Sequence, residues 1–248
     1  MTNGIKLMLK FRLIRLCKIY NKKRKVMSEN NFIPLNRYKK LSESEMLKRS
    51  EVFYEEIKKR RTVREFSDQA VPKEIIENCI KSAGTAPSGA NLQPWHFVII
   101  SNPEVKKKIR IAAEEEEKEF YNKRAPEEWL EVLKPLGTDE HKPFIESAPY
   151  LIAIFSKSYD LMDDGRQVKQ YYSIESTGIA TGILITAIHN AGLVSLTHTP
   201  SPMNFLNEIL NRPKNERPFL ILVVGYPTEY AKVPDIKKKS LQEIASFV

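Results

Sequence analysis

The sequence is poor in cysteine, in glycine and in long uncharged apolar runs, and each shortage excludes a class of protein. Only two cysteines, Cys17 and Cys79, occur in 248 residues, so no disulfide framework is expected and a reducing compartment, the cytoplasm, is predicted. The nine glycines build neither G-x-G-x-x-G nor a P-loop, which argues against a nucleotide held in a glycine-rich turn. The four histidines form no ligand spacing with either cysteine, so no metal site is predicted.

Acidic residues are missing from the first 28 positions, which hold nine lysines and arginines. Subtracting those nine from the 40 basic residues leaves 31 against 31 acidic ones, so the net charge of +9 lies in this leader and the body gives no reason to expect nucleic-acid binding. The leader interleaves basic and apolar residues too often to span a bilayer, which needs about 20 mostly apolar residues. Three interpretations stay open: an amphipathic segment on anionic lipid, a targeting peptide, or sequence upstream of a natural start at Met27, which we favour.

Hydrophobic periodicity in the remainder of the chain predicts a mixture of helices and strands. The stretches WHFVIIS and YLIAIFS are apolar throughout, which is typical of strands in a sheet that helices cover on both faces. The expected fold class is therefore α/β (α+β), with a central mixed sheet in a single domain over 29–248. Helices are expected at 41–61, 72–84, 103–124, 126–143, 171–192 and 202–211, and strands at 95–101, 150–156, 193–200 and 218–227.

Two apolar segments near the C-terminus carry expectations about a partner subunit. The helix at 171–192 is hydrophobic nearly all round and contains small residues that let another helix approach closely, so it is expected in the core or at a subunit interface. The strand at 218–227 is a candidate for pairing with a partner subunit if its edge is uncovered at home.

Two stretches carry polar groups in patterns that suit a ligand. RRTVREF places Arg60, Arg61 and Arg64 around Thr62 at the end of a helix, where guanidinium forks can hold a phosphate dianion, although a basic helix terminus explains them too. AGTAPSGANLQPW follows the next helix, and its backbone N–H groups with the Ser88 hydroxyl can face a ligand or form an ordinary turn. Both alternatives stay open for each stretch.

A third stretch, EEEEKEFYNKR at 114–124, has more acid than a helix surface needs. Glu114 and Lys118, and Glu119 and Lys123, stand four apart in the order that weakly supports a helix. A solvated face is therefore the simplest interpretation of this stretch taken alone.

Together these stretches resemble the FMN-dependent nitroreductase superfamily over about residues 50–240. Within it the sequence is most similar to the iodotyrosine deiodinase branch, in which GTAPSGA leads to PW, EEEE precedes a tyrosine, and NAGLV runs into a threonine motif, TxTP. The resemblance implies a nitroreductase-like fold, an FMN cofactor and an interlocked homodimer with the flavin at its interface.

The resemblance assigns cofactor contacts residue by residue. Thr199 is expected to donate to flavin N5, which makes it the catalytic residue that the resemblance implies. Lys238 stands where the family offers an arginine, and a lysine keeps the charge without the bidentate fork. The cofactor-binding residues implied are Arg60, Arg61, Thr62, Arg64, Pro87, Ser88, Thr197, His198, Thr199 and Lys238, with His198 in place of a middle threonine.

The resemblance also implies a lid at about 114–143 that grips the zwitterionic end of a halogenated tyrosine and is mobile without it. Glu117 and Tyr121, four apart, share one helix face, and Lys142 supplies the opposite charge. The backbone N–H of Ala90 is expected to hold the phenolate oxygen. The implied activity is reductive dehalogenation of 3-iodotyrosine, diiodotyrosine and related halotyrosines, releasing halide and tyrosine, with electrons from NAD(P)H, a reductase or another donor.

Three other functions remain as alternatives. The first is a general NAD(P)H-dependent nitroreductase or quinone reductase of the same fold. The second, from another class, is a membrane-surface or nucleic-acid binding module led by the basic leader. The third is a flavin-carrying sensor without turnover.

Overall fold

The computed structural model describes residues 32–162 and 164–248. The expectations for the leader 1–28, including Cys17, fall outside these residues. The chain divides into two compact units, 1–50 and 51–248. Helix α2 (Glu43–Lys58) begins in the first unit, where the Ser42 hydroxyl caps it by accepting the Glu45 N–H at 3.3 Å.

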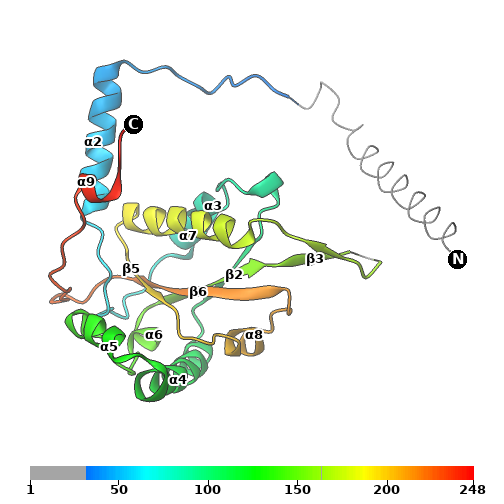
Figure 1. The fold of residues 1–248 in the computed structure, drawn as a ribbon, viewed down its shortest axis with the longest axis vertical. Helices are drawn as coiled ribbons and strands as arrows, with labels where there is room; N and C mark the ends of the chain where they lie inside the picture. Colours follow the sequence, from blue (N-terminus) through cyan, green and yellow to red (C-terminus); the bar gives the residue numbers. More distant parts are fainter. Residues whose placement is uncertain (1–31, 163) are drawn as a thin grey trace, which may run out of the picture. The chain divides into compact units, whose positions relative to one another are not determined.

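A four-stranded antiparallel sheet forms the centre of the second unit, in the order β1 (Trp95–Ile100), β2 (Tyr150–Lys157), β6 (Glu216–Gly225) and β5 (Val194–His198) (Figure 1). The parallel pairing that a mixed sheet requires is limited here to an isolated bridge between Thr62 and Ser195. Strand β6 is paired on both sides, with β2 and with β5. It therefore has no free edge with which to pair with a partner subunit, which the sequence had left possible. Strand β1 lies at an edge and is mostly half-buried, whereas a buried strand was expected.

Helices cover both faces of the sheet, as expected (Figure 1). On one face, Ile152 and Ile154 of β2 pack in a buried cluster with α3 (Lys73–Ala83) and α7 (Ser173–Asn190). On the other face, the alternate β2 residues Leu151, Ala153 and Phe155 join a second cluster. That cluster is closed by α4 (Pro103–Glu119), α6 (Phe144–Ser147) and α8 (Phe205–Ile209). Two buried faces explain why β2 is apolar at every position instead of alternating.

The chain between α4 and α6 returns over the sheet in short helical pieces. Asn102 caps α4 by accepting the Val105 N–H at 3.1 Å, and Pro103 takes the first helical position. After α4 come a π-helical turn, η3 (Phe120–Arg124), then α5 (Glu127–Leu133) and a 3-10 turn, η4 (Lys134–Leu136). Because this segment has few buried side chains, it is suited to move relative to the sheet.

The sequence did not predict the 3-10 turn η2 (Gly89–Asn91), helix α6, a short hairpin or a helical turn in the tail. Strands β3 (Tyr159–Leu161) and β4 (Gln167–Lys169) form a separate hairpin, and α9 (Leu241–Ile244) is a single capped turn in the tail. Helix α3 also starts one residue later than expected, because Pro72 is its cap and not its first residue. In the part of the chain that the structure describes, no helix has the length and apolar character needed to cross a membrane.

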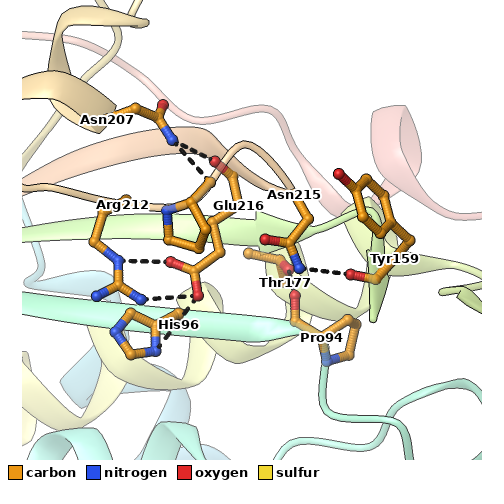
Figure 2. A network of polar contacts seen from close by, with 9 residues as sticks. Pro94, His96, Tyr159, Thr177, Asn207, Arg212, Asn215 and Glu216 are labelled. Atoms are coloured by element: carbon orange, nitrogen blue, oxygen red, sulfur yellow. Dashed lines mark hydrogen bonds and ion pairs between the residues drawn. The ribbon is translucent and has the colours of Figure 1, made fainter. Parts of the chain in front are cut away.

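A polar network fixes the connection from α8 into β6 (Figure 2). Arg212 donates two hydrogen bonds to the buried Glu216 carboxylate at 2.7 and 2.9 Å, and His96 Nδ1 of β1 lies 4.0 Å from the same group. The Asn207 amide donates to the Glu216 carbonyl at 2.8 Å. The network therefore fixes the chain that runs from β5 through α8 into β6.

Candidate active site

A cavity of about 300 Å³ lies beyond the end of β5, beneath the segment that links α4 to α6. Its apolar lining includes Phe120, Trp129, Leu133 and Phe144. Its polar lining contains seven of the residues expected at the site, which the fold brings together from four parts of the chain: Arg64, Glu117, Tyr121, Lys142, Thr197, His198 and Thr199.

The ion pair between Lys142 and Glu117 is the most buried charged contact in the described residues. The Lys142 Nζ lies 3.2 Å from Glu117 Oε2, and the two side chains are only 3% and 13% exposed. The ammonium also donates to the Thr138 hydroxyl at 3.3 Å and to the Asp139 carbonyl. Two opposite charges are therefore held together in a site from which water is largely excluded.

Tyr121 projects from the π-helical turn toward the same group of residues. Its hydroxyl donates to the Thr138 carbonyl at 3.2 Å, and the Lys142 ammonium lies 5.5 Å from its ring centroid. Burial raises the pKa of Tyr121, so the phenol remains a hydrogen-bond donor at neutral pH. An acid, a phenol and an ammonium thus converge at one place: helical spacing puts Glu117 and Tyr121 on one face, and the returning chain brings Lys142 to them.

His198, at the end of β5, is buried beside this ion pair. Its Nδ1 lies 4.0 Å from Glu117 Oε1, and its ring packs edge-to-face on Phe144 with centroids 5.7 Å apart. Burial, and then the positive charges of Lys142 and Arg64, lower the pKa of His198 from 6.5 to about 3. The imidazole is therefore neutral at neutral pH, and its Nε2 is buried without a hydrogen-bond partner among the described residues.

Arg64 provides the test of whether the cavity fits an anionic cofactor such as FMN. Its side chain is half-buried and its Nε, within the described residues, has no hydrogen-bond partner. Burial lowers the pKa of Arg64, although an arginine remains charged in any protein. A buried donor left unpaired is costly unless another group accepts from it, so Arg64 fits a flavin edge or phosphate oxygen at this position.

The other expected arginines line a second cavity, of about 330 Å³. Arg60 and Arg61 both face it, and the Arg61 guanidinium donates to the Pro234 carbonyl of the tail. Thr62 lies between Arg61 and Val63, which both line this cavity, and it forms a parallel β-bridge with Ser195 of β5. Lys238 lies exposed farther along the same tail, with no hydrogen bond or ion pair to any described residue.

The loop with Pro87, Ser88 and Ala90 is not joined to either cavity by a hydrogen bond between described residues. The Ser88 hydroxyl accepts the Gln93 N–H at 3.0 Å, so its own proton is free to be donated. Ala90 has a positive φ of 50°, and Asn91 and Gln93 also have positive φ. A run of non-glycine residues in this conformation is costly and is found most often where a loop presents its backbone to a ligand.

Glu114 was assigned to the wrong partner by helical spacing. Its carboxylate does not pair with Lys118; its Oε1 accepts from Arg110 Nε at 2.8 Å and from the Lys142 backbone N–H at 2.7 Å. The second expected pair is confirmed, with Lys123 Nζ 2.9 Å from Glu119. From the sequence, Arg110, one helical turn earlier, was the one partner of Glu114 that spacing could have indicated. No local pattern indicated that the chain returns to Glu114 at Lys142.

Known proteins resemble this chain over about four fifths of its length. Residues 57–226 match the model of the nitroreductase family. An iodotyrosine deiodinase of Haliscomenobacter hydrossis is 62% identical over 195 residues, which cover 79% of this chain and 88% of that protein. The Homo sapiens iodotyrosine deiodinase 1 is 46% identical over 203 residues, or 82% and 70% of the two chains. A crystal structure of oxidized iodotyrosine deiodinase bound to FMN and 3-iodo-L-tyrosine has a TM-score of 0.67 at 34% identity, covering 79% of this chain and all of that one.

Proposed function

The chain belongs to the nitroreductase family, within its iodotyrosine deiodinase branch, and on this premise we propose that it is an FMN-dependent dehalogenase of halogenated tyrosines. The observation that carries the proposal is the buried contact of Glu117 with Lys142, 3.2 Å apart, under Tyr121. A free amino acid carries an ammonium and a carboxylate side by side, and these two charges complement it. A neutral nitroaromatic carries neither charge, so it would not be recognised by the Glu117 carboxylate and the Lys142 ammonium.

In this proposal the chain's residues bind and orient the cofactor. Arg60, Arg61 and Arg64 hold the phosphate and the pyrimidine edge of FMN, with Thr62 beside them and Lys238 adding charge from the tail. The Thr199 hydroxyl donates a hydrogen bond to the flavin, and Thr197 and His198 contact the flavin from the same end of β5. Bound FMN supplies the two electrons, taken from an external donor, that with one proton replace the carbon–halogen bond by carbon–hydrogen and release halide.

The lid residues orient the substrate and exclude water. The Glu117 carboxylate accepts hydrogen bonds from the substrate ammonium, and Lys142 and Tyr121 bind the substrate carboxylate. The aromatic side chains of Phe120 and Trp129 cover the substrate ring. The Ala90 N–H, presented by the loop with positive φ, donates to the phenolate oxygen. Closing the lid strengthens each of these charged contacts because the local dielectric falls.

We place the 87–90 loop of a second copy over the cavity, so that a homodimer completes the site. Support comes from α7, which leaves Ile174 and Ile179 exposed at 63% and 47%, and from Tyr172 just before it, which is 69% exposed. Exposed apolar side chains on one helix are typical of a subunit interface. We expect Ile179→Glu to yield a monomer by light scattering that no longer retains FMN; a monomer that keeps its flavin would contradict the shared site.

The experiment that tests the function starts from the purified protein and its absorbance. We expect a yellow protein with bound FMN that, once reduced with dithionite, releases iodide from 3-iodotyrosine. Trypsin cleavage after Lys123 and Arg124 should slow when 3-iodotyrosine is added, because the lid closes. A colourless protein that refuses added FMN would overturn the proposal.

The alternatives give different results in the same preparation. A general nitroreductase would turn over nitroaromatics with NAD(P)H, would release no halide and would be unaffected by Lys142→Ala. A binding module led by the basic leader would lose its activity when residues 1–26 are removed, whereas the dehalogenase should be little changed. A flavin-carrying sensor would take up FMN and show no turnover with any reductant.

A further inference from the structure

Three side chains on one face of α4 bind the chain where it returns from the lid. Lys106, Arg110 and Glu114 stand four residues apart, so they form a single row along the helix. The buried Lys106 ammonium donates to the Glu146 carbonyl at 2.8 Å and the Ala148 carbonyl at 2.7 Å. Arg110 donates to the Glu146 carboxylate at 3.3 Å and to Glu114 at 2.8 Å. The returning segment is thus tied to α4 at successive turns.

Glu114 is the member of this row that reaches the site residue Lys142. One carboxylate oxygen, Oε1, accepts both the Lys142 backbone N–H at 2.7 Å and the Arg110 guanidinium. Burial by itself raises the pKa of Glu114, but the hydrogen bonds from Lys142 and Arg110 outweigh it and lower the pKa. Glu114 is therefore charged at neutral pH, and its bond to the Lys142 N–H is charge-assisted.

The row continues into the residues that face the ligand. Glu117 and Tyr121 follow Glu114 by three and seven positions, so they lie on nearly the same side of the helix. Lys142 is therefore held from one helix at two points: at its backbone by Glu114 and at its ammonium by Glu117. A lysine side chain alone has four rotatable bonds, so fixing its backbone removes much of the freedom with which its ammonium can move.

We propose that Glu114 is a positioning residue for Lys142, which sets where the lysine ammonium meets the substrate carboxylate. This inference rests on the proposed function, because it assigns Lys142 to the substrate. It gives two glutamates of the EEEE run different roles: Glu114 binds the Lys142 backbone, and Glu117 pairs with the Lys142 ammonium. It also makes the Lys142 end of the lid an anchored end, about which the remainder of the lid closes.

The kinetic test compares Glu114→Ala and Glu114→Gln with Glu115→Ala in the FMN-loaded enzyme. Glu115 is exposed and makes no hydrogen bond or ion pair with any described residue, so its variant is the matched control. We expect Glu114→Ala to raise KM for 3-iodotyrosine by about 10-fold or more, the loss of one bond to a charged group, with a smaller change in kcat. Glu114→Gln keeps an acceptor oxygen for the Lys142 N–H and should recover part of the loss.

A double variant separates positioning from a general loss of stability. If Glu114 acts through Lys142, adding Glu114→Ala to Lys142→Ala should raise KM by less than about 2-fold, because the positioned group is gone. Effects that multiply in the double variant would overturn the proposal, and so would a Glu114→Ala enzyme with the KM of the Glu115→Ala control.

Hydrogen exchange gives a readout that does not depend on turnover. The Lys142 amide should exchange slowly in the FMN-loaded protein without substrate and much faster in Glu114→Ala than in Glu115→Ala, with Glu114→Gln between the two. Unchanged exchange in both Glu114 variants would refute the anchor even if the protein releases iodide. Conversely, if the parent protein releases no iodide but its Lys142 amide exchanges slowly, and faster in Glu114→Ala, the contact is supported and only the dehalogenase function is overturned.

Discussion

Glu117→Gln is the substitution that tests the site most directly, because it removes one charge while keeping the shape of the side chain. At 3.2 Å, the attraction between Lys142 and Glu117 is about 5 kcal/mol in a medium with an effective dielectric constant near 20. Part of that attraction offsets the cost of burying both groups, and the amide oxygen of glutamine still accepts from the ammonium. We therefore expect unfolding free energy to fall by about 2 kcal/mol, which lowers Tm by roughly 4–8 °C.

The same substitution has a larger effect on substrate recognition. A hydrogen bond to a charged group contributes about 1.5–3 kcal/mol, so KM for 3-iodotyrosine should rise about 10- to 150-fold. The compound 2-iodophenol has the ring and the halogen but no ammonium, and its kcat/KM should change little. The assay is iodide release from both compounds by the dithionite-reduced enzyme, with Glu115→Gln as the exposed control.

The ratio of the two kcat/KM values decides the outcome. A fall in the ratio of 3-iodotyrosine to 2-iodophenol supports the role of Glu117 at the amino-acid head. An equal loss for both compounds would mean that Glu117 acts elsewhere in the reaction, and an unchanged ratio with an unchanged Tm would refute the reasoning about the buried pair.

Three further predictions follow from single features of the structure. The pKa of His198 in the folded protein, about 3, lies below its ordinary value of 6.5. The neutral imidazole therefore contributes fully to the free energy of unfolding above pH 6.5, and this contribution is lost as pH falls toward 3. Between pH 7 and 4.5, urea titrations should show that the unfolding free energy of the parent falls by roughly 2 kcal/mol more than that of His198→Gln. Arg64→Lys should retain the charge but lose about 10-fold in FMN affinity, measured by flavin fluorescence against the exposed control Arg217→Lys. Gly225→Ala would place a Cβ 2.5 Å from Pro149 Cδ and 3.4 Å from Phe66 Cδ1, so we expect a loss of about 1–3 kcal/mol by denaturant titration, and an unchanged midpoint would show that this packing yields.

Local patterns in the sequence were enough to predict most of the secondary structure. Helix α7 and strands β2 and β6 were expected from their apolar runs. The two strands lie inside the sheet between layers of helices, so they have little need of a polar side. The short hairpin β3–β4 was missed because its strands are exposed and carry no hydrophobic period. Most element boundaries shifted by one to three residues, as at Pro72, where the chemistry of capping and of the first helical turn is similar. The helix expected at 126–143 is much shorter: α5 ends at Leu133, and a 3-10 turn follows it only to Leu136.

The sequence by itself determined which side chains share a helix face and which family the chain resembles, because both are properties of spacing along one segment. Only the tertiary structure decided the partners. It paired Glu114 with the Lys142 backbone, 28 positions away, instead of with Lys118, and it placed β6 in the middle of the sheet. It also set the Ser88 loop apart from the cavity that holds Arg64 and Lys142. The physical reason is that periodicity reports the direction in which a residue points, whereas the order of strands and the path of the returning chain determine what it meets.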